Sequence, residues 1–148
     1  MKSPISTERK KVEAVPEWTQ QLCKLALQCG NASPAGDPVL LGEAYRILSE
    51  APSSFAGLIA ELPDRHTIGG LIAVGAYESA ALRLLPTQFG MMLSRGPGRD
   101  NWLASCCLGG RETDVTCIAG SASAALLGAY LQDLAGFFGA DTGHSIPN

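Results

Sequence analysis

The chain has 148 residues, 46% of them hydrophobic, and this length allows a buried core without metal ions or disulfide bonds. Its formal net charge of −3 disfavours extensive nucleic-acid binding, because acidic surfaces are repelled by phosphate. No run of about 18 apolar residues occurs, and residues 1–15 are charged, so we expect neither a membrane-spanning helix nor an export signal. These features predict a cytoplasmic protein that does not contact membranes.

The first half of the chain shows helical patterns that are separated by proline and glycine. Residues 1–15 are polar and are expected to form a flexible tail. Pro16-Glu17 is typical of a helix start, since proline suits the first helical position and the acid complements the helix dipole, and Gly30 would end this helix. Asp37-Pro38 repeats the pattern, with Asp37 as the expected N-cap. Three shorter helices are predicted in the same way: residues 53–62, 63–74 and 77–85.

Three short strands are predicted between residues 89 and 119. They are Phe89–Arg95, Trp102–Leu108 and Thr113–Ala119, of which the middle one is apolar on both faces. Gly96–Asn101 combines glycine, proline and Asx-turn residues and is typical of a hairpin loop, and Gly109–Glu112 would form the second turn. The pattern favours an antiparallel sheet with one wetter face.

A closing helix is predicted after the third strand. Ser121 or Ser123 could cap it, because each hydroxyl can accept a hydrogen bond from a free amide of the first turn. Apolar residues recur at intervals of three, four and seven over residues 124–138, and this stripe should cover the dry face of the sheet. Gly139 suits the helix end. Residues 141–148 form a second flexible tail.

Together these elements predict an α+β protein with amino-terminal helices, a three-stranded antiparallel β-meander and a closing helix. Residues 16–62 would form a helical subdomain, and residues 63–140 an α-β-β-β-α domain. We expect the amino-terminal helices to cover the second face of the sheet, which would give an α/β/α sandwich-like arrangement. The alternative is that this face is exposed and adhesive. Four residues give it its apolar character: Met92, Leu103, Cys107 and Ile118.

Parts of the chain between about Leu58 and Leu134 follow a known pattern. It has a helix of the type seen in Tyr77–Pro86, a strand opened by Trp102, and a closing helix that starts like Gly120–Leu127. In these features the chain resembles the ABA sandwich domain of uncharacterised phage and prophage proteins. Ser123-Ala124 stands where the family commonly has Thr-Pro, and Ser79 replaces its usual Asp. The family has no assigned activity, so the resemblance implies a phage or mobile-element origin rather than a chemistry.

No motif in the sequence predicts a catalytic, cofactor or metal site. The five cysteines form no C-x-x-C pair, and Cys106 and Cys107 would face opposite sides of a strand. We therefore interpret all five cysteines as reduced and mostly buried. His66 and His144 are the only histidines. Acid–base or zinc chemistry would need carboxylates or thiols beside one of them. We therefore expect no enzymatic activity, and an enzyme that uses His66 is one of the alternatives.

The leading hypothesis is a non-enzymatic protein that binds another protein. It could inhibit a host or defence protein in the cytoplasm of the host cell, or associate with itself. Few charged residues and no reaction centre favour this interpretation. The candidate interaction surface contains four residues: Arg95, Arg99, Leu103 and Arg111.

A second alternative is nucleic-acid binding, because helix–strand–strand–strand–helix is also the element order of a double-stranded-RNA-binding domain. Such a domain contacts the RNA backbone with its first hairpin loop and the start of its last helix. Arg95 and Arg99 flank the loop, but residues 121–131 contain no Lys or Arg. This absence disfavours an RNA contact at the last helix.

Overall fold

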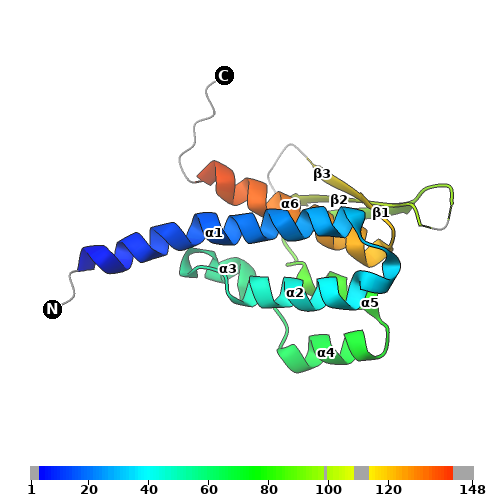
Figure 1. Ribbon diagram of the computed structural model, residues 1–148, viewed down its shortest axis with the longest axis horizontal. Coiled ribbons are helices and arrows are strands. Elements are labelled where there is room, and N and C mark those ends of the chain that lie inside the picture. The colour runs from blue at the N-terminus through cyan, green and yellow to red at the C-terminus, as the bar shows by residue number, and fades with distance from the viewer. Residues whose placement is uncertain (1–3, 99, 109–113, 142–148) are drawn as a thin grey trace, which may run out of the picture.

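The computed structural model describes residues 4–98, 100–108 and 114–141 and shows a group of helices beside one small sheet (Figure 1). The helices are α1 (Pro4–Asn31), α2 (Asp37–Ser49), α3 (Ala56–Ile59), α4 (Arg65–Ala73), α5 (Tyr77–Leu84) and α6 (Ala122–Asp141). The strands are β1 (Phe89–Arg95), β2 (Trp102–Leu108) and β3 (Val115–Ala119), and short 3-10 turns occupy Pro34–Gly36 and Ser53–Phe55. The predicted α+β class and the order of its elements are confirmed.

Helix α1 is longer than the sequence predicts. It begins at Pro4, and Pro16 lies inside it, so the predicted start at Pro16 is wrong. A proline inside a helix removes one backbone hydrogen bond, and the sequence alone does not show whether that loss ends the helix. The second half of α1 is amphipathic, and its buried face includes Trp18 and Leu22. The indole Nε1 of Trp18 donates to the Ile47 carbonyl at 2.8 Å and joins α1 to α2.

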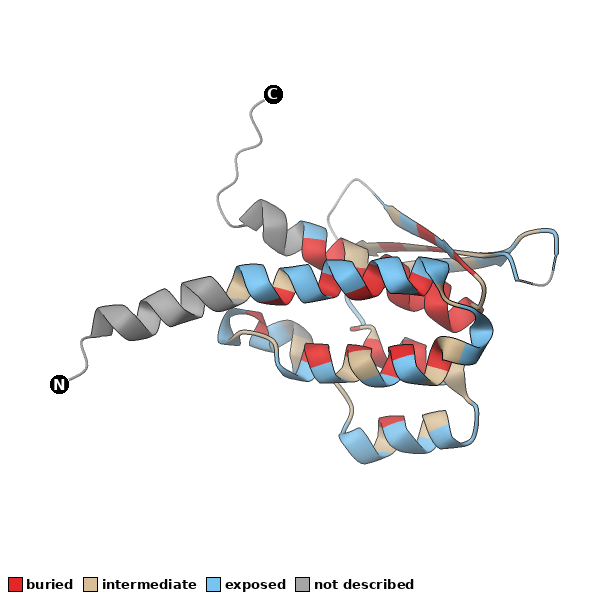
Figure 2. Cartoon of the chain, in the orientation of Figure 1, coloured by how far each residue is buried: buried red, intermediate tan, exposed pale blue. Residues whose placement is uncertain are grey.

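Helix α6 is the centre of the fold. Residues 122–135 are all buried except Gln132, which is half-buried. The helix packs against β2 and β3 on one side, and α1, α2 and α5 contact it elsewhere (Figure 2). The predicted apolar stripe is therefore too narrow, because α6 is buried on all sides and mostly apolar, with Ser123 and Asp133 as its buried polar residues. The Ser121 hydroxyl accepts from the Ala124 amide at 3.1 Å, which confirms the predicted cap.

The three strands form an antiparallel sheet in the order β1-β2-β3. The bounds of β1 and β2 agree with the prediction, whereas β3 begins two residues later, at Val115. In the register, Met91 pairs with Cys106, which pairs with Val115, so these side chains share one face. That face carries the buried residues Ala104 and Cys106 and packs against α6.

The other face of the sheet is exposed. Met92 is 74% exposed and Ile118 is 60% exposed. The expectation that the amino-terminal helices cover this face is wrong, because α1 and α2 pack against α6 instead. The physical reason is that most of the circumference of α6 is apolar, so these helices bury their own apolar faces there. One buried cluster consequently draws residues from both predicted segments, 16–62 and 63–140.

Candidate functional site

The exposed side of the sheet, which we call the outer face, is defined by the strand register. Along each strand its residues alternate with those that face α6. The outer-face residues within the strands are all uncharged. They are Gly90, Met92, Ser94, Leu103, Ser105, Cys107, Thr116 and Ile118. An uncharged sheet surface with exposed methionine and isoleucine is typical of an interaction site rather than of an ordinary solvated surface.

A hollow of about 320 Å³ lies on the outer face beside Gly90. Met92, Ser105 and Cys107 line it, together with Asp114 just before β3. The hydroxyls of Ser105 and Thr116 lie 3.1 Å apart and satisfy each other across the strands. Because Gly90 has no side chain, the surface is indented between the larger residues, and a protruding apolar side chain could fit there.

The predicted interaction residues do not share one surface. Leu103 lies on the outer face, but Arg95 is in register with Trp102 and so belongs to the opposite face. The Arg95 guanidinium carbon lies 5.9 Å from the centre of the Trp102 ring, within the range of a cation–π contact. Arg99 and Arg111 lie outside the described residues. Leu103 and Arg95, the two predicted residues that the structure describes, thus lie on opposite faces of the sheet.

The start of α6 and the surroundings of His66 are the places where the two alternative functions would act. An RNA contact would require an exposed start of the last helix, but residues 122–131 are buried. His66 is exposed in the first turn of α4, and Asp64 beside it caps that helix by accepting from the Thr67 amide at 2.7 Å. This hydrogen bond lowers the pKa of Asp64. His144 lies outside the described residues.

The cysteines are distributed as small core residues. Cys29, Cys106 and Cys117 are buried, Cys107 is half-buried on the outer face, and Cys23 is exposed. Burial raises the pKa of the Cys29 and Cys106 thiols to about 12, and it also raises that of Cys117. The three buried thiols are therefore poor nucleophiles at neutral pH, since the thiolate is the reactive form.

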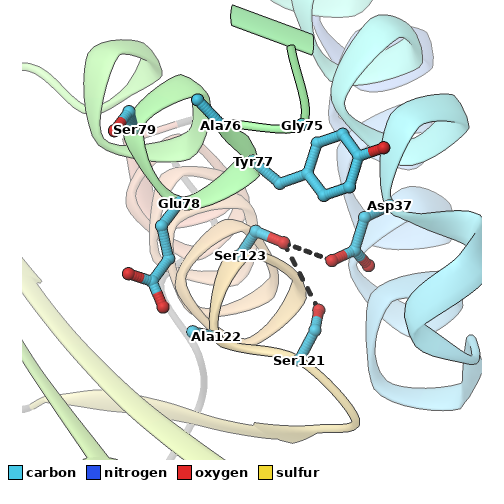
Figure 3. A pocket seen from close by; sticks show the side chains of 9 residues that line it. All are labelled: Asp37, Gly75, Ala76, Tyr77, Glu78, Ser79, Ser121, Ala122 and Ser123. Atoms are coloured by element: carbon cyan, nitrogen blue, oxygen red, sulfur yellow. Dashed lines mark hydrogen bonds between the residues drawn. The ribbon is translucent and has the colours of Figure 1, made fainter. Parts of the chain in front are cut away.

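A second hollow, which we call the Asp37 cavity, has a volume of about 330 Å³ and lies where α2, α5 and α6 begin (Figure 3). Its lining includes Asp37, residues 75–79 and residues 121–123. Asp37 is only 4% exposed. Its Oδ2 accepts a hydrogen bond from the Ser123 hydroxyl at 2.5 Å, and the Ser121 hydroxyl lies 3.3 Å from that of Ser123.

The sequence prediction missed this cavity because it assigned Asp37 a capping role. Gly36 occupies the N-cap position, and the Asp37 side chain turns inward to Ser123 instead. The spacing of Asp37, Leu41, Ala44 and Leu48 is the pattern that could have revealed it, since all four lie on one helical face. An acid on the apolar side of a helix predicts a buried polar contact.

Comparison with known proteins finds no match to this chain among family models, curated proteins or solved structures. The resemblance to the phage ABA sandwich domain therefore stays a prediction. Within the described residues, no helix is both long and apolar enough to cross a membrane.

Proposed function

We propose that this protein works by binding another protein through the outer face of its sheet. The observation that supports this proposal best is the exposure of Met92 and Ile118 on a sheet whose other face packs against α6. Apolar surface in water is unfavourable, and covering it is the main driving force of protein association. Within the described strands the outer face carries no charge that a partner would have to desolvate, and Asp114, just before β3, is the charged residue that lines its hollow.

Strand β1 adds a second contact element, because it lies at an edge of the described sheet. Natural proteins usually protect such edges with lysine, proline or a bulge. β1 contains neither lysine nor proline, and its single charged residue, Arg95, is at its end. Its backbone groups could therefore pair with an extended segment of the partner. We expect a partner with an apolar contact surface next to an exposed strand.

The proposal includes two candidates for the partner. One candidate is a second copy of this chain. The other is a host or defence protein that a phage-encoded inhibitor would occupy in the host cytoplasm, and this version rests on the sequence resemblance alone. Neither version requires a catalytic residue or a cofactor.

The test compares two exposed apolar positions. A photo-reactive amino acid is placed at Ile118 on the outer face or at Val39, which is 75% exposed on α2. In cells of the native host, position 118 should crosslink to one protein or to the chain itself, and position 39 should not. The complex is then rebuilt from purified proteins. Light scattering should show a fixed stoichiometry that is insensitive to salt, because the contact is apolar.

Matched charge substitutions complete the test. Ile118→Lys should abolish the rebuilt complex, because a lysine would have to be desolvated in the contact. Val39→Lys should leave it intact. The proposal fails if both variants bind equally well, or if the crosslinks form only at position 39.

A further inference from the structure

The carboxylate of Asp37 has an unsatisfied oxygen. Oδ2 accepts the hydrogen bond from Ser123, whereas Oδ1 is buried and has no hydrogen-bond partner. A buried carboxylate oxygen without a donor is energetically costly. Asp37 lines the Asp37 cavity. A rotation of its side chain would turn Oδ1 toward the cavity, where a molecule with a hydrogen-bond donor could satisfy this carboxylate.

The charges around the Asp37 cavity favour a cation over an anion. Asp37 and Glu78 both line it, and no Lys or Arg does so among the described residues. Three helices begin there, and each N-terminus contributes about half a positive elementary charge. This positive potential helps to hold one carboxylate in a buried position, but it does not balance two. An anionic ligand would meet two carboxylates at short range.

The other lining groups suit an organic ammonium better than a bare metal ion. The hydroxyl oxygens of Ser121 and Ser123 can accept N–H donors, and Tyr77 adds an aromatic ring, a group that attracts cations, to the lining. In the described part of the chain, no three His, Cys, Asp or Glu residues are grouped so that they could hold a metal ion. The volume of about 330 Å³ is at the lower end of small-molecule sites, so the ligand is small.

We infer that the Asp37 cavity binds a small organic ammonium compound, with Asp37 as the buried charge partner and Glu78 as the exposed one. This site goes beyond the proposed protein binding and shares no residue with the outer face. Its occupation would complete the hydrogen bonding of Asp37 at the point where α2, α5 and α6 meet.

The test is a titration of the full ¹⁵N-labelled chain, followed by amide chemical shifts. The probes are butylammonium chloride, the similar-sized neutral butan-1-ol and the anionic sodium butanoate, at constant ionic strength. Butylammonium should give saturable shifts at residues 75–79 and 121–123. We expect a Kd on the order of 1–10 mM, as is usual for so small a ligand. Butanol and butanoate should give no saturable shift there.

Three substitutions assign the interaction to the carboxylates. Asp37→Asn keeps the size of the side chain and should weaken butylammonium binding about tenfold or more, because a charge-assisted hydrogen bond is lost. Glu78→Gln, at an exposed position that should not affect folding, should weaken it about two- to threefold. Glu17→Gln removes an exposed carboxylate of α1 that does not line the cavity, and it should change nothing.

Each remaining outcome decides against the inference. It is overturned if butanol or butanoate shifts the same amides as strongly, or if no probe gives a saturable shift. It is also overturned if butylammonium binds folded Asp37→Asn as tightly as the parent chain. If Asp37→Asn does not fold, Glu78→Gln decides, and unchanged affinity in that variant contradicts the inference.

Discussion

The two faces of the sheet are built on the same three strands and have opposite environments. On the inner face, Ala104 and Cys106 are completely buried and the sheet packs against α6. On the outer face, Met92 and Ile118 alternate with those positions and are largely exposed. Since neighbouring residues of a strand point to opposite faces, one short sequence serves two purposes. The inner face holds the fold together, and the outer face is the surface that we propose for binding a partner.

The largest effect is expected from a truncation in the helix that covers the inner face. Leu131 of α6 is fully buried, so Leu131→Ala removes packed side-chain volume and leaves a cavity. We expect a loss of about 2–5 kcal/mol in the free energy of unfolding, measured by urea denaturation. Met92→Ala on the outer face is the control and should change stability by less than about 0.5 kcal/mol. Similar losses in both variants would remove the distinction between the faces.

A close approach at Gly128 should produce the next largest effect. An added Cβ at this position of α6 would lie 2.5 Å from the Cys117 sulfur of β3 and 3.2 Å from the Cys29 Cβ of α1. Gly128→Ala should therefore destabilise the protein by about 1–3 kcal/mol in spite of the better helix propensity of alanine. Denaturation of the purified variant measures this loss.

Two further variants show whether the crowding is the cause. Gly136→Ala lies in the same helix, where an added Cβ meets no atom of the described residues within 4 Å. It should stabilise the protein by up to about 1 kcal/mol. Adding Cys117→Ala to Gly128→Ala should recover part of the lost stability. Without such recovery, the close approach at Gly128 would not explain the loss.

Alkaline pH should lower the free energy of unfolding, because the buried thiols resist the loss of their protons in the folded chain. The pKa of Cys29 is raised from 9.0 to about 12, chiefly by burial and then by the charges of Cys117 and Asp37. Above pH 9 the unfolded chain loses this proton while the folded chain keeps it, so stability falls as the pH rises toward 12. Cys29→Ala should lower the slope of stability against pH by up to about 1.4 kcal/mol per pH unit. Urea titrations at several pH values measure the slope, and equal slopes would contradict the assignment.

The smallest effect on stability is expected on the outer face. The double variant Met92→Ser/Ile118→Thr replaces two exposed apolar side chains with polar ones, and its free energy of unfolding should change by no more than about 0.5 kcal/mol. The same change should clearly reduce the fluorescence of a dye that binds apolar surface. Unchanged dye binding would show that the outer face is not the apolar surface of the free chain.

The sequence predicts the local elements of this fold well and their packing less well. The bounds of β1 and β2 follow from side-chain alternation and the turn residues of Gly96–Asn101, because both are local properties. Which sheet face is covered depends on the surface against which α1 and α2 bury their own apolar residues. α1 and α2 pack against α6 because most of its circumference is apolar, and a search for one apolar stripe does not reveal this.

The candidate sites also combine features that local sequence patterns show with packing that they do not show. Leu103, Met92 and Ile118 could be placed on one face from alternation alone, whereas the cover of that face could not. The contact between Asp37 and Ser123 joins residues 86 positions apart in the chain, so no local pattern contains it. The position of Asp37 on an apolar helical face was the available indication.

The exposure of the outer face can be measured directly by methyl NMR with a soluble gadolinium chelate, at concentrations where light scattering shows a monomer. The chelate should strongly relax the methyl groups of Met92 and Ile118, because they lie open to solvent. It should spare the methyl of Ala104, which is buried on the inner face of the same strands. Protection of Met92 and Ile118 equal to that of Ala104 in the monomer would contradict the assignment of the outer face as the free binding surface.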